Sequence, residues 1–275
     1  MLSSIPLSVS AGISKPRLAR IFITATVFGA LANATAPALL VAEQVGGLPD
    51  VGVSKVVLCC VALGLFRLLQ APRAEDLLPF MLPAAIGALL RSADAAWLGL
   101  SISMLLLLTA NRTTGRARDG ATVLLAVGLH APIVSAAGLL IGGDLLALDT
   151  KLAAAFLSLS GTPVSASAAS LSVPGGMDLL LVWRCGVLGN LSVALMMWYT
   201  ATRFVLGCVP ARALPTAVLV ATVMVAVNAL RIAGMAFDAQ TYEWLHDGRG
   251  ASLVRMAALA CVAGIIAFDL RRLSA

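Results

Sequence analysis

The chain has 275 residues, of which 60% are hydrophobic and only 12% are charged, and its mean hydropathy is +0.98. Soluble domains carry about a quarter charged residues, so this composition argues against a water-soluble fold. The formal net charge is +6, but no stretch combines clustered Lys and Arg with aromatic residues, so nucleic acid is not an expected partner.

Long apolar runs separate the few charges, and a helix needs about 20 apolar residues to cross a bilayer core about 30 Å thick. We therefore predict an all-α fold, a polytopic transmembrane helical bundle of about eight spans. It forms a single transmembrane domain over residues 21–275, preceded by a cytoplasmic segment over residues 1–20. Pro79 and Pro83 interrupt the third span and its neighbours are short, so seven or nine spans remain possible. The predicted spans cover residues 21–42, 53–69, 77–90, 95–110, 121–143, 177–201, 214–237 and 251–270.

The N-terminal segment allows a second interpretation. Lys15, Arg17 and Arg20 precede an apolar run with small residues near its end, a pattern that is also typical of a cleavable signal peptide. The apolar run continues to Ala42, which favours an uncleaved first span.

The loops differ in their content of Lys and Arg, and basic loops are retained in the cytoplasm. The segments 43–55, 144–174 and 238–250 are poor in basic residues. Eight spans with both termini cytoplasmic place all three segments outside, so we expect a multi-pass protein of the cell (inner) membrane. The basic segments carry Arg112, Arg116, Arg118, Arg203, Arg212, Arg271 and Arg272.

The segment 144–174 is the longest one outside the predicted spans. Leu152, Phe156 and Leu159 follow each other at helical spacing, and Gly161 and Pro163 come next. This pattern predicts an interfacial helix that breaks into an extended piece, although a simple long connector remains an alternative.

Charged side chains within a span are costly, at about 2.5 to 3.5 kcal/mol for Arg at the helix centre, so each needs a reason. Arg67 and Arg91 lie near the ends of weak spans, and we interpret both as anchors that reach the headgroups. Arg231 lies near the outer end of the seventh span, and Asn228 shares its helical face. Together they favour an anion or a carbonyl oxygen, although a helix-packing amide beside a snorkelling Arg explains them as well.

The five cysteines show no CxxC or paired spacing, so neither a zinc site nor a disulfide framework is expected, and no cofactor is predicted. Cys185 lies about seven residues into the sixth predicted span, near the outer leaflet and at a depth similar to that of Arg231. Arg184 precedes it, and a nearby positive charge favours the reactive thiolate. Simple packing of a small side chain is the alternative.

His246 lies in the last predicted outer loop, and a histidine is the usual group for moving a proton near neutral pH. The other histidine, His130, is in mid-span and is interpreted as a helix-packing hydrogen bonder. The predicted topology brings Cys185, Arg231 and His246 to one side of the membrane. A nucleophile, a cationic group and a proton carrier are the parts of acyl transfer.

The order and spacing of these residues resemble the exosortase/archaeosortase family of membrane-embedded cysteine transpeptidases. The motif-bearing part is about residues 150–272, and the first four spans match only in their hydrophobic character. The family usually has a small residue before the Cys and Ser or Thr, then Gly, after it. This chain departs from that pattern with Arg184, Cys185, Gly186 and Val187. The resemblance rests on Gly161-Thr162-Pro163-Val164 ahead of Cys185, then Asn228-x-x-Arg231-Ile232, then His246-x-x-x-Gly250.

The resemblance implies that Cys185 is the nucleophile, Arg231 its electrostatic partner and His246 the acid/base group. Archaeal members use a second arginine in place of the histidine, which makes Arg255 a reserve candidate. The implied substrates are exported proteins that end in a short motif such as Pro-Glu-Pro, a transmembrane helix and a basic cluster. The enzyme would cut them at the outer membrane face.

On this hypothesis the cut proceeds through a thioester, which then undergoes hydrolysis or transfer. Arg231 favours the thiolate of Cys185, and Arg184 is a second candidate for this role. Arg231 and Asn228 stabilise the oxyanion.

Two other classes of protein stay open. In a permease or export component, Arg231 and Asn228 bind an anionic solute and Cys185 only packs. A non-catalytic assembly protein would tolerate substitutions at all these positions. The sequence has no inverted repeat or paired broken helices of the kind that often mark transporter sites.

Overall fold

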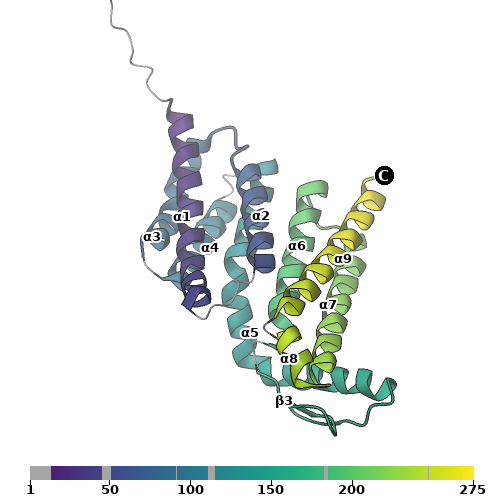
Figure 1. Cartoon of the computed structure of the whole chain (residues 1–275). Coiled ribbons are helices and arrows are strands. Elements are labelled where there is room, and N and C mark those ends of the chain that lie inside the picture. Colours follow the sequence, from purple (N-terminus) through teal and green to yellow (C-terminus); the bar gives the residue numbers. More distant parts are fainter. Residues whose placement is uncertain (1–13, 45–50, 91, 111–114, 183–184, 247) are drawn as a thin grey trace, which may run out of the picture.

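Helices make up most of the structure, and they run up and down beside one another (Figure 1). The computed structural model describes residues 14–44, 51–90, 92–110, 115–182, 185–246 and 248–275, with the backbone alone for 34–44 and 51–54. The first part contains α1 (Lys15–Gln44), α2 (Val51–Leu68), the 3₁₀ helix η1 (Ala74–Met81), α3 (Leu82–Leu89), α4 (Ala93–Thr109) and α5 (Gly115–Leu159). The second part contains strands β1 (Ser165–Ser167), β2 (Ser170–Ser172) and β3 (Asp178–Leu180), then α6 (Leu188–Leu206), η3 (Ala211–Ala213), α7 (Leu214–Met235), α8 (Ala239–His246) and α9 (Arg249–Ser274).

Three helical segments in the described part of the chain are long and apolar enough to cross a membrane: Gly115–Leu159, Ala211–Met235 and Arg249–Ser274. Ala93–Thr109 is apolar but shorter. The helical membrane character expected from the composition is therefore confirmed in this coarser form. The count of eight spans and the side of the membrane on which each loop lies stay predictions.

Three clusters of buried apolar side chains hold the elements together. The first surrounds Met104 and joins α1 to α4 with the start of α5. Another surrounds Val220 and joins α6, α7 and α9. The remaining one surrounds Ile232 and joins the end of α5, the sheet, the end of α7 and α8. Cys185 belongs to this last cluster, so the candidate site is built on its own small core.

Polar contacts join helices of the first part of the chain, α2 and α5, to helix α6 of the second part. The guanidinium of Arg67 on α2 lies 4.2 Å from the centroid of the Phe204 ring on α6 and donates to the carbonyl of the same residue. His130 on α5 hydrogen-bonds Ser192 on α6 over 2.9 Å. The predicted helix-packing role of His130 is confirmed, whereas Arg67 contacts Phe204 of another helix, so its predicted role as a headgroup anchor stays a prediction. Arg91 lies outside the described residues.

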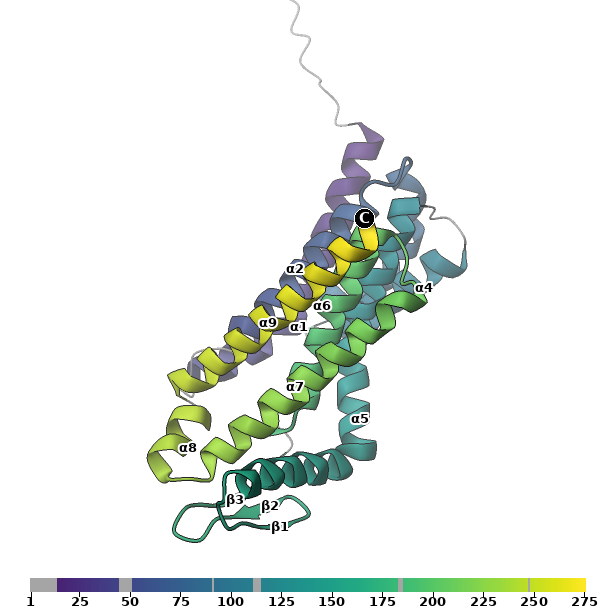
Figure 2. The same ribbon diagram turned by 90° about the vertical axis from the view of Figure 1, so that its right-hand side faces the viewer.

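Helix α5 is longer than one span needs, because its 45 residues at about 1.5 Å each give roughly 65 Å. Figure 2 shows that it bends and that its later part runs across the ends of neighbouring helices. Consecutive glycines are a known cause of such bends, and α5 contains Gly142 and Gly143. The predicted helix after residue 144 is thus present, but it continues α5 without a break in the backbone.

The end of α5 is set by Gly161, whose φ of 79° is accessible to glycine at little cost. Its N–H donates to the carbonyl of Ser158 over 3.0 Å, and the N–H of Thr162 donates to that of Leu157 over 3.0 Å. These two bonds form a Schellman motif, which stops the helix and starts the extended segment. The predicted break at this position is confirmed.

The extended segment forms a three-stranded antiparallel sheet in the order β1-β2-β3. It lies against the end of α7, where the N–H of Met177 donates to the carbonyl of Ala236 over 2.9 Å. Gly176 permits this approach, since a Cβ there would lie 2.5 Å from the same carbonyl oxygen. The sheet returns the chain to the start of α6.

One prediction about this region is wrong. The sixth span does not begin at residue 177, because β3 pairs with β2 and α6 begins only at Leu188. The described chain is mostly helical, as predicted, and this small sheet is an addition that the sequence did not indicate. Residues 178–182 are apolar after the first, and an apolar run this short fits a strand as well as a helix. Tertiary pairing with β2 decides in favour of the strand.

Candidate active site

Cys185 lies between the sheet and α6, rather than seven residues into a span as predicted. Its N–H donates to the carbonyl of Val182 over 2.8 Å, and the residue is only 7% exposed. Helix α6 begins three residues later, at Leu188.

His246 is the last residue of α8, so the prediction that it lies in a loop is wrong in detail. Its Nε2 lies 3.5 Å from the Sγ of Cys185, within hydrogen-bonding range for sulfur. The ring of Tyr242, one helical turn earlier, stacks on the imidazole with 4.9 Å between centroids and 16° between planes. This stacking fixes the plane in which the imidazole can face the thiol.

Helix α8 is short, and both its ends are held by specific residues. Asp238 caps the N-terminus, where its Oδ1 accepts from the N–H of Thr241 over 2.8 Å and its Oδ2 accepts from the hydroxyl of Thr241 over 2.8 Å. These two bonds lower the pKa of Asp238 below its ordinary value, mainly through the backbone N–H. At the other end, Gly250 of α9 faces Trp244, and a Cβ at this glycine would overlap the indole. The glycine of the sequence motif therefore lets α9 approach α8.

Arg231 on α7 holds the C-terminal end of α8. Its Nε donates to the carbonyl of Leu245 over 2.9 Å, and its Nη2 donates to the carbonyl of His246 over 3.2 Å. The last carbonyls of a helix lack partners within the helix, and a cationic donor satisfies them and opposes the negative end of the helix dipole. The guanidinium thus fixes the residue that carries the imidazole.

Asn228 lies one turn before Arg231 and is only 4% exposed. Its Nδ2 donates to the carbonyl of Cys185 over 3.3 Å. Asp149, near the end of α5, is 1% exposed, and its Oδ2 accepts from the N–H of Val187 over 2.9 Å. These two polar side chains therefore hold the backbone on either side of Gly186.

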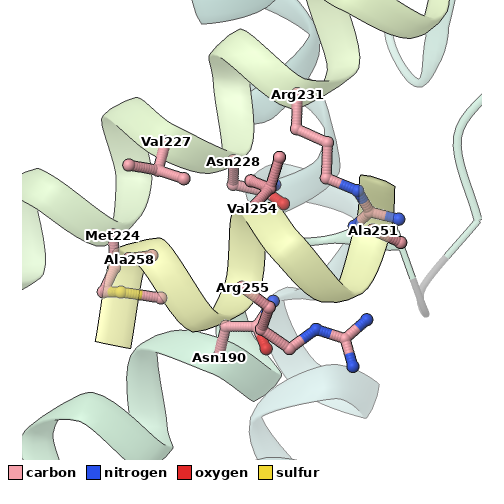
Figure 3. A pocket seen from close by; sticks show the side chains of 9 residues that line it. All are labelled: Asn190, Met224, Val227, Asn228, Arg231, Ala251, Val254, Arg255 and Ala258. Atoms are coloured by element: carbon pink, nitrogen blue, oxygen red, sulfur yellow. The ribbon is translucent and has the colours of Figure 1, made fainter. Parts of the chain in front are cut away.

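A narrow cavity lies beside this arrangement, between α6, α7 and α9 (Figure 3). It is lined by Asn228 and Arg231, as expected for two residues on one helical face, and also by Asn190 and Arg255. Figure 3 shows the side chains of Arg231 and Arg255 extended toward the same side. The space open to the centre of a water molecule is about 20 Å³, which holds about one water.

The structure brings together Asn228 and Arg231 of α7, His246 of α8 and Cys185 of the segment before α6. Arg255 lines the adjoining cavity, whereas His246 is the residue that touches the thiol. Arg184 lies outside the described residues. Arg231 and Asn228 were predicted to donate to an oxyanion. In the structure they donate to backbone carbonyls of the protein itself.

Sequence reasoning missed Tyr242 and Asp149. Tyr242 has a local signal, because it lies four residues before His246 and would face it on a helix. Asp149 has only a weak one, a lone acidic residue at the end of an apolar run. Among the described residues, no group of three or more His, Cys, Asp or Glu side chains is arranged to hold a metal ion.

No family model, no curated protein and no solved structure matches this chain.

Proposed function

We propose that the chain is a membrane-embedded cysteine peptidase or transpeptidase with Cys185 as nucleophile and His246 as acid/base group. The observation that carries the proposal is the 3.5 Å contact between Sγ and Nε2 of two residues that are 61 positions apart. A thiol beside an imidazole that is itself held in place is the arrangement that nucleophilic catalysis requires. The resemblance to exosortases, which rests on the same residues, agrees with this assignment.

In the proposed reaction, Nε2 of His246 takes the thiol proton as Sγ of Cys185 attacks a peptide carbonyl carbon. The tetrahedral intermediate collapses to a thioester, and the imidazolium gives its proton to the leaving amine. Water or an acceptor amine then attacks the thioester. Its proton passes to His246 and on to the departing thiolate, which restores the starting state.

Arg231 and Asn228 act in this proposal through the segments that they hold. Arg231 fixes the carbonyl of His246, and Asn228 fixes the carbonyl of Cys185. This differs from the oxyanion role expected from the sequence, and the bonds of both side chains to protein carbonyls favour positioning. Arg255 stays a reserve candidate for the proton-transfer role because it lines the cavity next to the pair.

For the membrane arrangement, we propose eight spans, with both termini cytoplasmic and the site at the outer face of the cell (inner) membrane. The support is the separation of charge along the molecule. Arg203 near the end of α6 pairs with Asp119 near the start of α5 over 2.8 Å, and Arg212 just before α7 donates to the carbonyl of Leu273 near the end of α9. Figure 1 places the C-terminus at the end opposite α8 and β3. Basic ends are retained in the cytoplasm.

The proposed substrates are exported proteins that end in a short motif, one transmembrane helix and a basic cluster. In such a protein the motif lies at the outer face, on the side that the proposed topology gives to Cys185. The rival proposal of an anion permease is less well supported, since the cavity beside Arg231 holds about one water and the Arg231 donors bind carbonyls.

The test follows the conversion of a tagged exported protein of this kind in cells that express the chain. Cys185→Ala is expected to abolish conversion. Cys60→Ala is the matched control, because Cys60 is also buried but belongs to the first core, whose members among the described residues include no histidine. Undiminished conversion by Cys185→Ala would end the nucleophile assignment.

A further inference from the structure

Helix α6 begins without a capping side chain of its own. Val187 occupies the N-cap position and makes no side-chain cap bond. The cap comes instead from Asp149 on α5, 38 residues earlier, whose Oδ2 accepts from the N–H of Val187 over 2.9 Å. The first turn of a helix has N–H groups that need acceptors, so a buried carboxylate here determines where α6 starts.

The same carboxylate lies beside Asn228, the residue whose amide holds the carbonyl of Cys185. Asp149 and Asn228 therefore approach the short segment from Cys185 to Val187 from two different helices. Cys185 precedes the capped residue by two positions, so any shift of the start of α6 also shifts the thiol relative to the imidazole of His246.

The burial of Asp149 is difficult to explain by stability alone. The residue is 1% exposed, and its second oxygen, Oδ1, has no hydrogen-bond partner among the described residues. A buried carboxylate with an unsatisfied oxygen is unfavourable, and an apolar residue at this position would avoid that penalty. The capping bond to the segment that carries the nucleophile gives the carboxylate a purpose.

We propose that Asp149 is a positioning residue that holds Cys185 against His246 by capping α6. This inference rests on the proposed function, in which the Cys185–His246 pair performs the chemistry. It adds a residue from α5, so the later part of that helix becomes a component of the site.

The experiment measures how strongly the reactivity of Cys185 depends on His246. The purified chain in nanodiscs is alkylated with iodoacetamide near neutral pH, and the rate at Cys185 is followed by peptide mass spectrometry with the exposed Cys208 as internal reference. The quantity of interest is the ratio of the rates with His246 and with His246→Ala. Comparing this ratio between the unchanged chain and an Asp149 variant cancels changes in thiol exposure that the variant causes equally with His246 and with alanine at that position.

In the otherwise unchanged chain the ratio is expected to be well above one. Asp149→Leu and Asp149→Ala both remove the acceptor, with different packing, and each is expected to lower the ratio by about tenfold or more, since displacements of about 1 Å in a reacting pair have effects up to about 100-fold. Asp149→Asn keeps an acceptor oxygen for the N–H of Val187 and is expected to retain most of the ratio.

Asp269 provides the matched control, because it is also a buried carboxylate, 6% exposed, but it bonds Thr216 over 2.5 Å and Arg272 over 2.9 Å at the other end of α9. Asp269→Leu is expected to lower the melting temperature and to leave the ratio unchanged. A ratio in Asp149→Leu or Asp149→Ala equal to that of the unchanged chain overturns this inference alone. A ratio of one already in the unchanged chain removes the Cys185–His246 pair, and the proposed function falls with it.

Discussion

Replacing Arg231 with alanine removes two hydrogen bonds that hold the C-terminal carbonyls of α8, at 2.9 Å to Leu245 and 3.2 Å to His246. Bonds from a charged donor contribute about 1.5–3 kcal/mol each, and for this half-buried side chain the lower end applies, so about 3 kcal/mol is lost for the two. Since about 1.4 kcal/mol changes an equilibrium tenfold, the fraction of molecules with α8 detached should rise about 100-fold.

Hydrogen–deuterium exchange in nanodiscs measures this directly, because exchange of the amides in residues 239–246 reports local opening of α8. Arg231→Ala should speed their exchange about 100-fold, by the energy above. In Arg231→Lys the exchange rate should lie between those of the unchanged chain and Arg231→Ala, since an ammonium lacks the planar fork that reaches both carbonyls.

The matched control is Arg212→Ala. Arg212 also donates to a carbonyl at the end of a helix, that of Leu273, but at the opposite end of the molecule. It should leave exchange in α8 unchanged. If Arg231→Ala abolished conversion of substrate while the amides of α8 exchanged at the original rate, Arg231 would act on the reacting atoms, and the positioning role would be refuted.

Two further predictions concern the ends of α8. Gly250→Ala places a Cβ against the indole of Trp244 and should separate α8 from α9, which lowers both the melting temperature and the rate of conversion. The control is Gly264→Ala on the same helix, where a Cβ meets nothing within 4 Å, and it should be neutral or stabilising by about 0.5–1 kcal/mol. Equal effects of the two substitutions would contradict this prediction. Asp238 has a pKa held below its ordinary value of 3.8 by the bonds from Thr241, so its ionised form is the one favoured by folding. Its contribution to the stability of α8 is therefore complete above pH 3.8 and is lost as the pH falls through the lowered pKa. Circular dichroism or hydrogen exchange at acid pH should show this loss for the unchanged chain but not for Asp238→Ala.

The helices that the sequence placed well are those with uniform apolar runs and clear ends. Helix α7 was expected over 214–237 and extends over Leu214–Met235, and it has a proline in its first turn, which favours a helix start. Its amide and its charged residue, Asn228 and Arg231, could be placed on one face from their spacing alone. Both line the same cavity in the structure.

The start of α6 and the presence of α8 could not be predicted in the same way. The short apolar run after Asp178 fits a helix or a strand, and its pairing with β2 lies in a segment predicted to be an interfacial helix, an extended piece or a connector, so the strand could not be predicted. Helix α8 has eight residues and a mixed composition, so only its cap, Asp238, gives a local signal.

The site itself was partly predictable, because the chain has only five cysteines and two histidines, and because a charged residue within an apolar run needs a reason. Cys185, Arg231 and His246 stand out for that reason. The bonds that position them do not, since the cap from Asp149 to Val187 and the bond from Asn228 to Cys185 join residues on different helices. Such contacts arise from tertiary packing and have no pattern within one helix.

The central claim is that Cys185 and His246 work as one unit, and a double-mutant cycle on substrate conversion tests it most directly. Residues that act together in catalysis are strongly non-additive. Conversion rates should therefore fall to the same low level in Cys185→Ala, in His246→Ala and in the double variant. Undiminished conversion in Cys185→Ala, or losses that multiply in the double variant, would contradict the account.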